Sequence, residues 1–467
     1  MKISLNSILI MLVSSILVFV LFADAKGTYL HGSELQVFLL LVVTLFSLIV
    51  NAYFKNEFLE MLNVVFVVFY IFRIPVLFDA GVVSDVTKKN VDIAVIPWEI
   101  FILSFQYLSL VVCILAVNPK IPRWNINANF SEFIFKRLLL FSLVIIIANI
   151  IMISFWFNLR VQTLSHIPAI LKTIFTIESA LMLIIVLAFS VEKKILLKYK
   201  YFISFCFILG IGCITYQGGK AIVLSIVLLI FFAMLIVKGP VVFRLRGLLV
   251  TAGLALSTFG MYAVGATFRM YQAGGGPMNN IGQYGEFFHR LFIEKTNLPD
   301  LLHSISYRLG YFDFFIEKVS NPVYEPFVSF TYYFKALLDK VTPGFDFFGV
   351  PFMSRALYTA YHGDTLVTNS EFITVFGESH LLLGFFSFCL FLPILMLIKY
   401  TLSHYRNTSG LSNALFYMYI LYMFYWWLTG MGLDMLIAFL IYIGIFIFTT
   451  MGLIRYWSWR EHAILND

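Results

Sequence analysis

The chain has 467 residues, of which 61% are hydrophobic and only 12% are charged. Soluble globular domains carry about 25% charged residues, so this composition excludes that class and indicates a polytopic membrane protein. The net charge of +7 is spread over short segments between apolar runs. It forms no separate basic patch, and nucleic acid is therefore not an expected partner.

Apolar runs recur along the chain at the length that a helix needs to cross a hydrocarbon core about 30 Å thick. We predict an all-α bundle of about twelve transmembrane helices. They cover residues 7–23, 36–54, 61–78, 98–117, 138–157, 174–191, 202–216, 220–237, 248–266, 381–398, 412–429 and 435–453.

The distribution of Lys and Arg predicts the orientation of these helices. When both termini are placed in the cytoplasm, the inner segments hold far more Lys and Arg than the short outer loops. The charged residues closest to the membrane, among them Arg73, Glu99 and Glu378, then lie at outer helix ends, and none lies at a mid-membrane position. We therefore expect the functional surface at the outer face.

The long segment 267–380 separates helices one to nine (residues 1–266) from helices ten to twelve and a cytoplasmic tail (residues 381–467). Connections of this length are usually functional when they are ordered, and aromatic residues recur throughout this one. Apolar residues at helical spacing predict two amphipathic helices. One follows Pro299, and its apolar face includes Phe312 and Ile316. The other runs from Phe327 to Val341. We expect both to lie on or dip into the outer leaflet and to cap the bundle.

The sequence offers no recognisable metal or cofactor site. All four cysteines fall inside predicted spans, and no Cys or His cluster has metal-ligand spacing. Gly219-Lys220 lacks the earlier glycine and the following Ser or Thr of a nucleotide-binding P-loop. We therefore predict no cofactor and no metal.

A transferase that acts at an outer membrane face has no nucleotide-activated donor there, so its donor would be activated on a lipid. If the donor is a polyprenyl diphosphate sugar, fixed cations must stabilise the diphosphate leaving group, and the fork of an arginine suits this best. A partly desolvated carboxylate or a histidine would serve as the base for the acceptor hydroxyl.

Two motifs resemble those of a known family. The turn Thr215-Tyr-Gln-Gly-Gly-Lys-Ala-Ile-Val-Leu resembles the Gly-Ser-Arg-Gly type turn of bacterial oligosaccharide repeat-unit (Wzy-type, O-antigen) polymerases and O-antigen ligases. The segment Thr368-Asn-Ser-Glu-Phe-Ile-Thr-Val-Phe-Gly-Glu-Ser-His-Leu-Leu-Leu-Gly384 is similar to their Gly-Glu motif. The resemblance covers roughly residues 203–400. Lys220 stands where the family usually has arginine. Because lysine is a point charge and lacks the planar fork of arginine, this difference argues against bidentate phosphate binding at that position.

The resemblance implies a multi-spanning, GT-C-like and metal-independent glycosyltransferase in the bacterial inner membrane. It would join undecaprenyl-diphosphate-linked oligosaccharide donors and acceptors into a surface polysaccharide, such as the O-antigen of lipopolysaccharide, at the periplasmic face. Membrane lipid and a chain-length-regulating co-polymerase are the further partners that it implies.

Within this hypothesis the candidate site residues fall into two groups. As base or acceptor ligand, Glu378 is favoured because it lies in the second motif, and Glu371 and His380 follow. For the diphosphate, Arg308 is favoured over four other cations. The full set of diphosphate candidates is Arg308, Arg269, Lys220, Arg73 and Arg290.

Each main candidate also has a structural interpretation. Lys220 and Arg73 could extend from helix ends to the headgroups. Arg308 could form a local ion pair with Asp313 or Glu317. Glu378 would suit a helix N-terminus, where the helix dipole stabilises a carboxylate.

Two other functions stay open. An O-antigen ligase-like glycan transferase would rely on His303 or His380 more than on Glu378. A flippase or exporter of lipid-linked oligosaccharide would show internal repeats or broken helices near mid-membrane, and the sequence reveals neither.

Overall fold

The computed structural model describes most of the chain. The described residues are 2–23, 25, 28–79, 92–122, 131–158, 163–164, 177–216, 229–236, 242–244, 260, 281–289, 311–320, 326, 328–341, 347–351, 353, 356, 374–404, 411–429 and 433–466.

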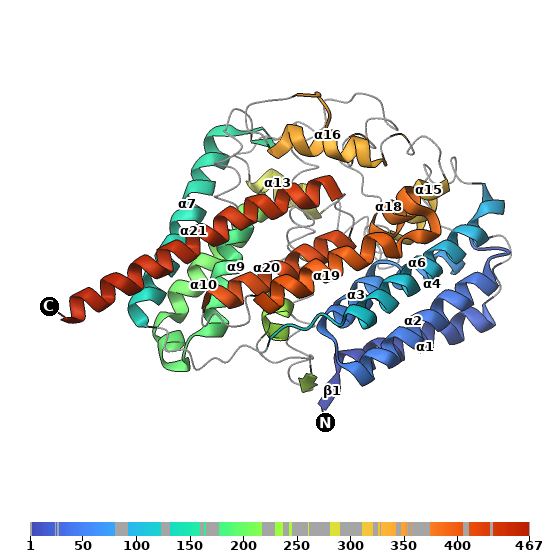
Figure 1. Cartoon of the computed structure of the whole chain (residues 1–467), viewed down its shortest axis with the longest axis horizontal. Coiled ribbons are helices and arrows are strands. Elements are labelled where there is room, and N and C mark those ends of the chain that lie inside the picture. Colours follow the sequence, from blue (N-terminus) through green and yellow to red (C-terminus); the bar gives the residue numbers. More distant parts are fainter. Residues whose placement is uncertain are drawn as a thin grey trace.

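The described part is predominantly helical (Figure 1). Its first half contains α1 (Leu5–Phe22), α2 (Glu34–Phe54), α3 (Glu57–Phe69), the 3-10 turn η1 (Ile71–Arg73), α4 (Ile74–Asp79), the 3-10 turn η2 (Ile93–Val95), α6 (Ile96–Val117), α7 (Glu132–Trp156), α9 (Ile177–Ser190) and α10 (Lys193–Tyr216). Its second half contains α13 (Ile281–Phe288), α15 (Tyr311–Ser320), α16 (Phe330–Val341), α18 (Thr374–Leu383), the 3-10 turn η5 (Gly384–Phe386), α19 (Phe388–His404), α20 (Leu411–Leu428) and α21 (Leu433–Asn466).

Two short antiparallel pairs are the strands that the described residues contain. β1 (Lys2–Ser4) pairs with β4 (Val242–Arg244), and β2 (Phe157–Asn158) pairs with β3 (Thr163–Leu164). The first pair ties the N-terminus to a segment more than 200 residues further along the chain. Both pairs lie beside helix ends and add no layer to the bundle.

The long helices are apolar enough to cross a membrane. Within the described residues, six helices pass that test by length and hydropathy, and a seventh span is formed if the bent pair α18–α19 is counted as one. Helices also occupy the predicted spans at 174–191, 412–429 and 435–453, as α9, α20 and α21. The predicted spans 220–237 and 248–266 lie mostly outside the described residues.

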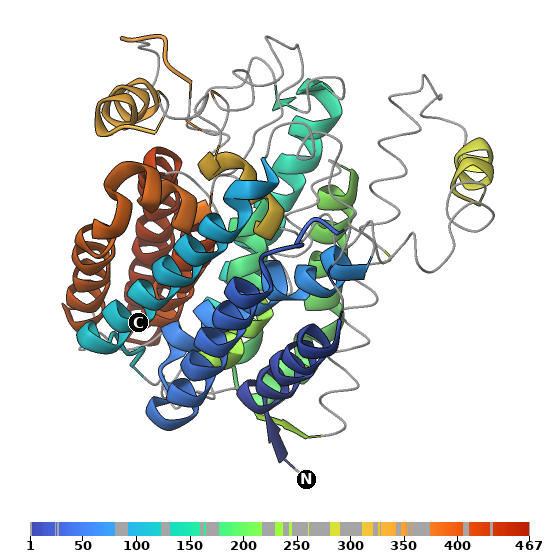
Figure 2. The ribbon, with the colours of Figure 1, turned by 90° about the vertical axis from the view of Figure 1, so that its right-hand side faces the viewer.

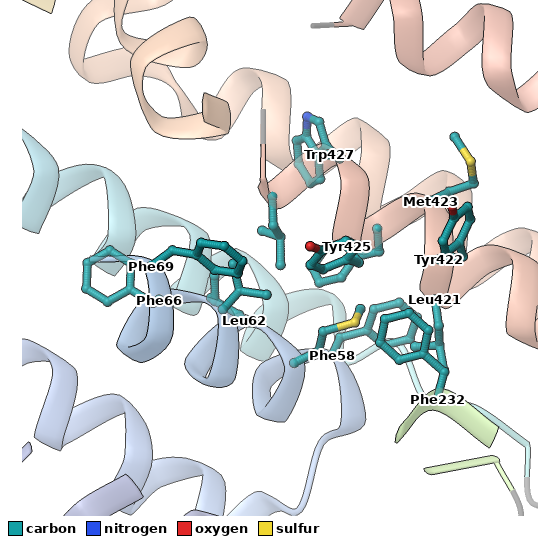
Figure 3. Packing of buried hydrophobic residues seen from close by; sticks show 14 of the residues in the cluster. Phe58, Leu62, Phe66, Phe69, Phe232, Leu421, Tyr422, Met423, Tyr425 and Trp427 are labelled. Carbon is teal, nitrogen blue, oxygen red and sulfur yellow. The ribbon is translucent and has the colours of Figure 1, made fainter. Parts of the chain in front are cut away.

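The centre of the bundle is the face shared by α3 and α20. Helix α20 is apolar around its whole circumference, and nearly all of its described side chains are buried, which is the pattern of a helix surrounded by protein. Aromatic side chains of both helices, among them Phe58 and Tyr425, pack across this face (Figure 3). The Phe58 and Phe424 rings lie 5.1 Å apart in an edge-to-face contact. On another face, a Cβ at Gly210 of α10 would lie 2.9 Å from Cδ2 of Leu181 in α9, so any larger residue there would require Leu181 to shift.

The two ends of the bundle can be followed from contacts between neighbouring helices. We call one end of the bundle the Lys399 end. There the Lys399 ammonium donates to the Val117 carbonyl at 2.7 Å, and the side-chain amide of Asn56 donates to the side chain of Asn118 and to the carbonyl of Pro119. We call the opposite end the Arg73 end. There Arg73 contacts α15, and the first residue of α21 contacts α18. These contacts join helix ends that the charge pattern assigns to the same side.

Three sequence predictions change in detail. The helix predicted at 202–216 begins at Lys193, because its charged first turns remain helical beyond the apolar run. The helix predicted to end at residue 453 continues to Asn466, so residues assigned to a tail are helical. The helix predicted at 381–398 is broken, since α18 and α19 meet at a bend of 115°.

The two amphipathic helices predicted in the long segment are present where that segment is described. α15 begins at Tyr311, and residues 299–310 lie outside the described part. α16 ends at Val341, as predicted from Pro343. Helix α16 crosses the upper end of α21 (Figure 1) and stands at the edge of the molecule when the view is turned (Figure 2). Its Phe330 and Phe334 are exposed, whereas Tyr333 and Ala336 are buried.

Candidate functional site at the Arg73 end

A break in the third span positions Arg73. The helix that begins at Glu57 tightens into a 3-10 turn at Ile71–Arg73 and resumes as α4. Pro75 has no N–H to bond to the carbonyl of Ile71, and its ring would clash with that carbonyl, which accounts for the break. The turn buries Arg73, which is only 1% exposed. An arginine at a lipid-facing helix end would instead extend its side chain to the headgroups.

Arg73 forms a buried ion pair with Asp313 of α15, which lies 240 residues away in sequence. Nε of Arg73 donates to Oδ1 at 3.3 Å, and its Nη2 donates to Oδ2 at 3.0 Å. Both side chains are 1% exposed. This two-point geometry suits the arginine fork and holds the guanidinium in one orientation. Burial raises the pKa of the Asp313 carboxyl, and the charge of Arg73 opposes that shift.

Aromatic packing holds α15 inside the bundle. Phe312, Phe315 and Ile316 are fully buried. The ring of Tyr311 stacks on Phe69 at 4.8 Å. In Figure 1, α15 lies next to α18 at the ends of α4 and α6. The predicted apolar face of this helix is therefore confirmed at Phe312 and Ile316, and it packs against protein.

The broken span carries Glu378. Gly384 follows α18 with a φ of +56°, a conformation that glycine adopts without strain, and the chain then turns into α19. Gln106 lies near the middle of its span and donates to the carbonyl of Gly384 at 2.9 Å. Phe376 packs edge-on against Phe66 at 5.6 Å. Helix α18 therefore lies against two spans, and the expectation of a single unbroken helix over residues 381–398 is wrong.

The carboxylate of Glu378 is hydrogen-bonded to a backbone N–H group. Its Oε1 accepts a hydrogen bond of 2.8 Å from the N–H of Leu433, the first residue of α21. The carboxylate is 1% exposed. A negative charge at a helix N-terminus is favoured by the helix dipole. The predicted structural alternative for Glu378 thus has a concrete basis, although the helix that it caps is α21 and not its own.

His380 lies two residues further along α18. It is partly buried, and its ring meets Phe385 edge-on at 6.1 Å. The Nδ1 atom is buried without a hydrogen-bond partner among the described atoms.

The structure brings Arg73 and Glu378 to neighbouring elements. Tyr70 precedes the Arg73 turn and packs against Phe376 at 5.6 Å, two residues before Glu378. The other predicted site residues lie outside the described part of the chain. They are Lys220, Arg269, Arg290, Arg308 and Glu371, together with His303 of the ligase alternative.

Sequence reasoning missed the residues that surround this pair. From the sequence, Asp313 is expected only as a local partner of Arg308, and no role is expected for Tyr29. Glu99 and Glu317 are also buried here. The segment Tyr311-Phe-Asp-Phe-Phe315 did contain a signal, because a lone carboxylate on an otherwise apolar face needs a partner when it is buried.

The described residues contain no group of three or more His, Cys, Asp or Glu side chains arranged to hold a metal ion. Comparison with models of protein families, with curated proteins and with solved structures gives no match. The chemistry of the Arg73 end must therefore be argued from its own residues.

Proposed function

We propose that this chain is a glycosyltransferase of the bacterial inner membrane that joins undecaprenyl-diphosphate-linked oligosaccharide repeat units at the periplasmic face. In this proposal it has a GT-C-like plan of about twelve spans, and both termini are cytoplasmic. Its product is a surface polysaccharide, and a chain-length-regulating co-polymerase is an expected partner.

The observation that supports the proposal most is the buried Arg73–Asp313 pair. It fixes a helix of the long outer segment inside the bundle, beside the broken span that carries Glu378. Ionisable groups buried at membrane depth are costly and usually mark a functional site. A cation held in one orientation is also what a diphosphate leaving group requires.

The proposal assigns a role to each group. Asp313 orients the guanidinium of Arg73, and Arg73 is one of the candidate ligands of the diphosphate. Glu378 is the favoured base or acceptor ligand, followed by Glu371 and His380. The other diphosphate ligands are Arg308, Arg269, Lys220 and Arg290.

The test is a polymerisation assay with purified protein. The protein is incubated with a lipid diphosphate-linked repeat unit in the presence of EDTA, and the products are separated on a gel. Wild type is expected to give a ladder that is lost in Arg308→Ala and Glu378→Gln. Lys198→Ala is the matched control, because Lys198 is exposed at the opposite end. Loss of the ladder in that control, or no ladder in wild type, contradicts the proposal.

One observation favours a second candidate, an exporter of lipid-linked oligosaccharide. Transporters often build their sites from discontinuous helices, and the 115° bend between α18 and α19 is such a break. In proteoliposomes, passage of the lipid-linked repeat unit across the membrane without a ladder would establish the exporter. A ladder formed without passage would exclude it.

A further inference from the structure

Four phenylalanines are exposed on α16 and on the short segment 347–351 that follows it. Phe330 and Phe334 lie four residues apart on α16, so they share one face of the helix. Phe347 and Phe348 belong to the segment 347–351. The exposed fractions of the four side chains are 56%, 61%, 63% and 47%, in chain order. Exposed apolar side chains in this number mark a contact surface.

Asp339 holds the segment 347–351 against α16. Its Oδ1 accepts from the N–H of Phe348 at 2.9 Å, and its Oδ2 accepts from the N–H of Val350 at 2.8 Å. Gly349 between them has a φ of +63°, a left-handed conformation that turns neighbouring N–H groups toward one anion. The side chain of Asp339 is buried, and bonds from N–H groups to a charged acceptor are strong. Asp339 therefore acts as a latch between the helix and the segment.

Two further contacts join the segment to the helix. The hydroxyl of Tyr332 donates to the carbonyl of Pro351 at 2.8 Å. The ammonium of Lys335 lies 5.7 Å from the centre of the Phe348 ring. Because Lys335 directly follows Phe334, the ring of Phe348 lies beside the exposed face of α16. Helix and segment thus form one surface, which we call the aromatic surface and define as Phe330, Phe334, Phe347 and Phe348.

The opposite side of α16 packs against membrane-spanning elements. Tyr333 and Met353 form a small buried cluster with Leu381 and Leu382 of α18 and with Leu433, the first residue of α21. Helix α16 lies at that end of α21 in Figure 1 and at the edge of the molecule in Figure 2. The aromatic surface therefore lies where a long apolar helix begins, close to the boundary between water and hydrocarbon.

The chemistry of the aromatic surface favours a lipid leaflet as its occupant. A phenylalanine side chain carries no hydrogen-bonding group, whereas a glycan presents hydroxyls that need donors and acceptors. A leaflet receives apolar helix faces just below its headgroups, and a lysine among them can extend to the lipid phosphates. Lys335 is exposed beside the Phe348 ring and meets this requirement.

We propose that the aromatic surface inserts into the phospholipid leaflet at the Arg73 end and anchors the long segment 267–380 to the membrane. The anchor has two parts, the helix α16 and the segment 347–351, and Asp339 latches the second to the first. The sequence predicts leaflet contact for both amphipathic helices. The structure assigns it to α16 alone, because the apolar face of α15 packs inside the bundle. This inference does not depend on the proposed function.

Fluorescence quenching at single introduced cysteines tests the anchor. Full-length protein with Cys389→Ser, which removes the exposed native cysteine, carries Phe334→Cys or Phe347→Cys. Each protein is labelled with the fluorophore NBD and placed in phospholipid nanodiscs. Lipids with a nitroxide on the acyl chain quench a label inside the leaflet, and iodide quenches a label in water. Both labels are expected to respond to the nitroxide lipid, and about fivefold or more weakly to iodide than a label in water, because such a face is buried about 5–10 Å into the leaflet.

Two reference positions calibrate the quenching. His31→Cys, in the turn before α2, is exposed and serves as the water reference. Ile208→Cys, exposed on α10, serves as the lipid reference. The Cys389→Ser parent corrects for labelling of the three buried native cysteines.

Asp339→Ala tests the latch. It is expected to make the Phe347 label as sensitive to iodide as the His31 label, while the Phe334 label stays in the leaflet. The Phe334 label thus reports whether α16 keeps its place. If it does not, Asp339→Asn replaces Asp339→Ala, since it keeps one acceptor oxygen and should weaken the latch in the same direction.

Each result supports or overturns the anchor. If iodide quenches both labels as it quenches the His31 label, the aromatic surface faces water and the anchor is rejected in favour of a protein or glycan partner. If only the Phe334 label lies in the leaflet, or if the Phe347 label stays there when the latch is removed, the two-part anchor is rejected. The ladder of the polymerisation assay does not enter this test, so either proposal can fail without the other.

Discussion

The two ends of the bundle use polar residues differently. At the Arg73 end, charged side chains are buried and contact one another or a helix terminus across elements far apart in sequence. At the Lys399 end, Lys399 bonds to a backbone carbonyl, and the Glu132–Lys198 pair is exposed. The buried Glu57 and Glu60 of that end belong to the first turn of α3, where the helix dipole favours a negative charge.

This difference distinguishes polar contacts that maintain the fold from polar contacts that form a candidate functional site. Asparagine caps and carbonyl contacts at the Lys399 end complete helix termini, which every helix must do in some way. A fully buried Arg–Asp pair is not required for stability, because well-packed apolar residues of similar volume often stabilise a protein as well or better. The cost of burying these charges is the physical reason to look for function at the Arg73 end.

The largest effect is expected from breaking the buried pair. Asp313→Ala leaves Arg73 charged without this partner and should lower the free energy of unfolding by about 3–5 kcal/mol. The double variant Arg73→Met with Asp313→Leu should recover most of that loss. Thermal unfolding in detergent measures both. An Asp313→Ala variant as stable as wild type would show that the pair does not hold α15 in the bundle.

The double variant also sharpens the comparison in activity assays. If the ion pair only anchors α15 in the bundle, the double variant, in which apolar packing anchors this helix, forms the ladder. If Arg73 contacts the diphosphate, as proposed, the protein folds and forms none.

A smaller effect is expected at Glu378. Glu378→Ala removes a charge-assisted bond to the N–H of Leu433 and should cost about 1.5–3 kcal/mol. Glu378→Gln keeps an acceptor and should cost less. A ladder in Glu378→Gln with wild-type intensity would reduce Glu378 to a cap of α21, and the base would then be sought at Glu371 or His380.

At the Lys399 end, Asn56→Ala tests a purely structural contact. Asn56 accepts from the N–H groups of Phe58 and Leu59 as the N-cap of α3, so its loss should cost about 0.5–2 kcal/mol. The ladder should persist under conditions where the variant is folded. Complete loss of activity in a stable Asn56→Ala protein would contradict the division between the two ends.

The smallest effect is expected for Glu132→Ala and Lys198→Ala. Both side chains are exposed, and exposed ion pairs contribute little because water and salt screen them. Neither the unfolding temperature nor the ladder should change measurably. A clear loss of stability would mean that the Lys399 end also depends on charge pairing.

Part of the candidate site could be predicted from sequence. Arg73 and Glu378 stood out as charges at apolar helix ends, and both prove to be buried at the same end of the bundle. Their partners could not be predicted in the same way. Asp313 looked like a neighbour of Arg308, since periodicity reports which residues share a helix face and not which helix that face meets.

The sequence by itself determined the class of the protein, the positions of most long helices, the amphipathic segments α15 and α16, and the sorting of charges toward helix ends. Hydropathy and helical periodicity are local properties, so they can be read residue by residue. Only the tertiary structure decided the Arg73–Asp313 pair, the cap of Glu378 on α21 and the break between α18 and α19. These depend on contacts between segments distant in sequence, and a single glycine gives too weak a local signal to predict the break.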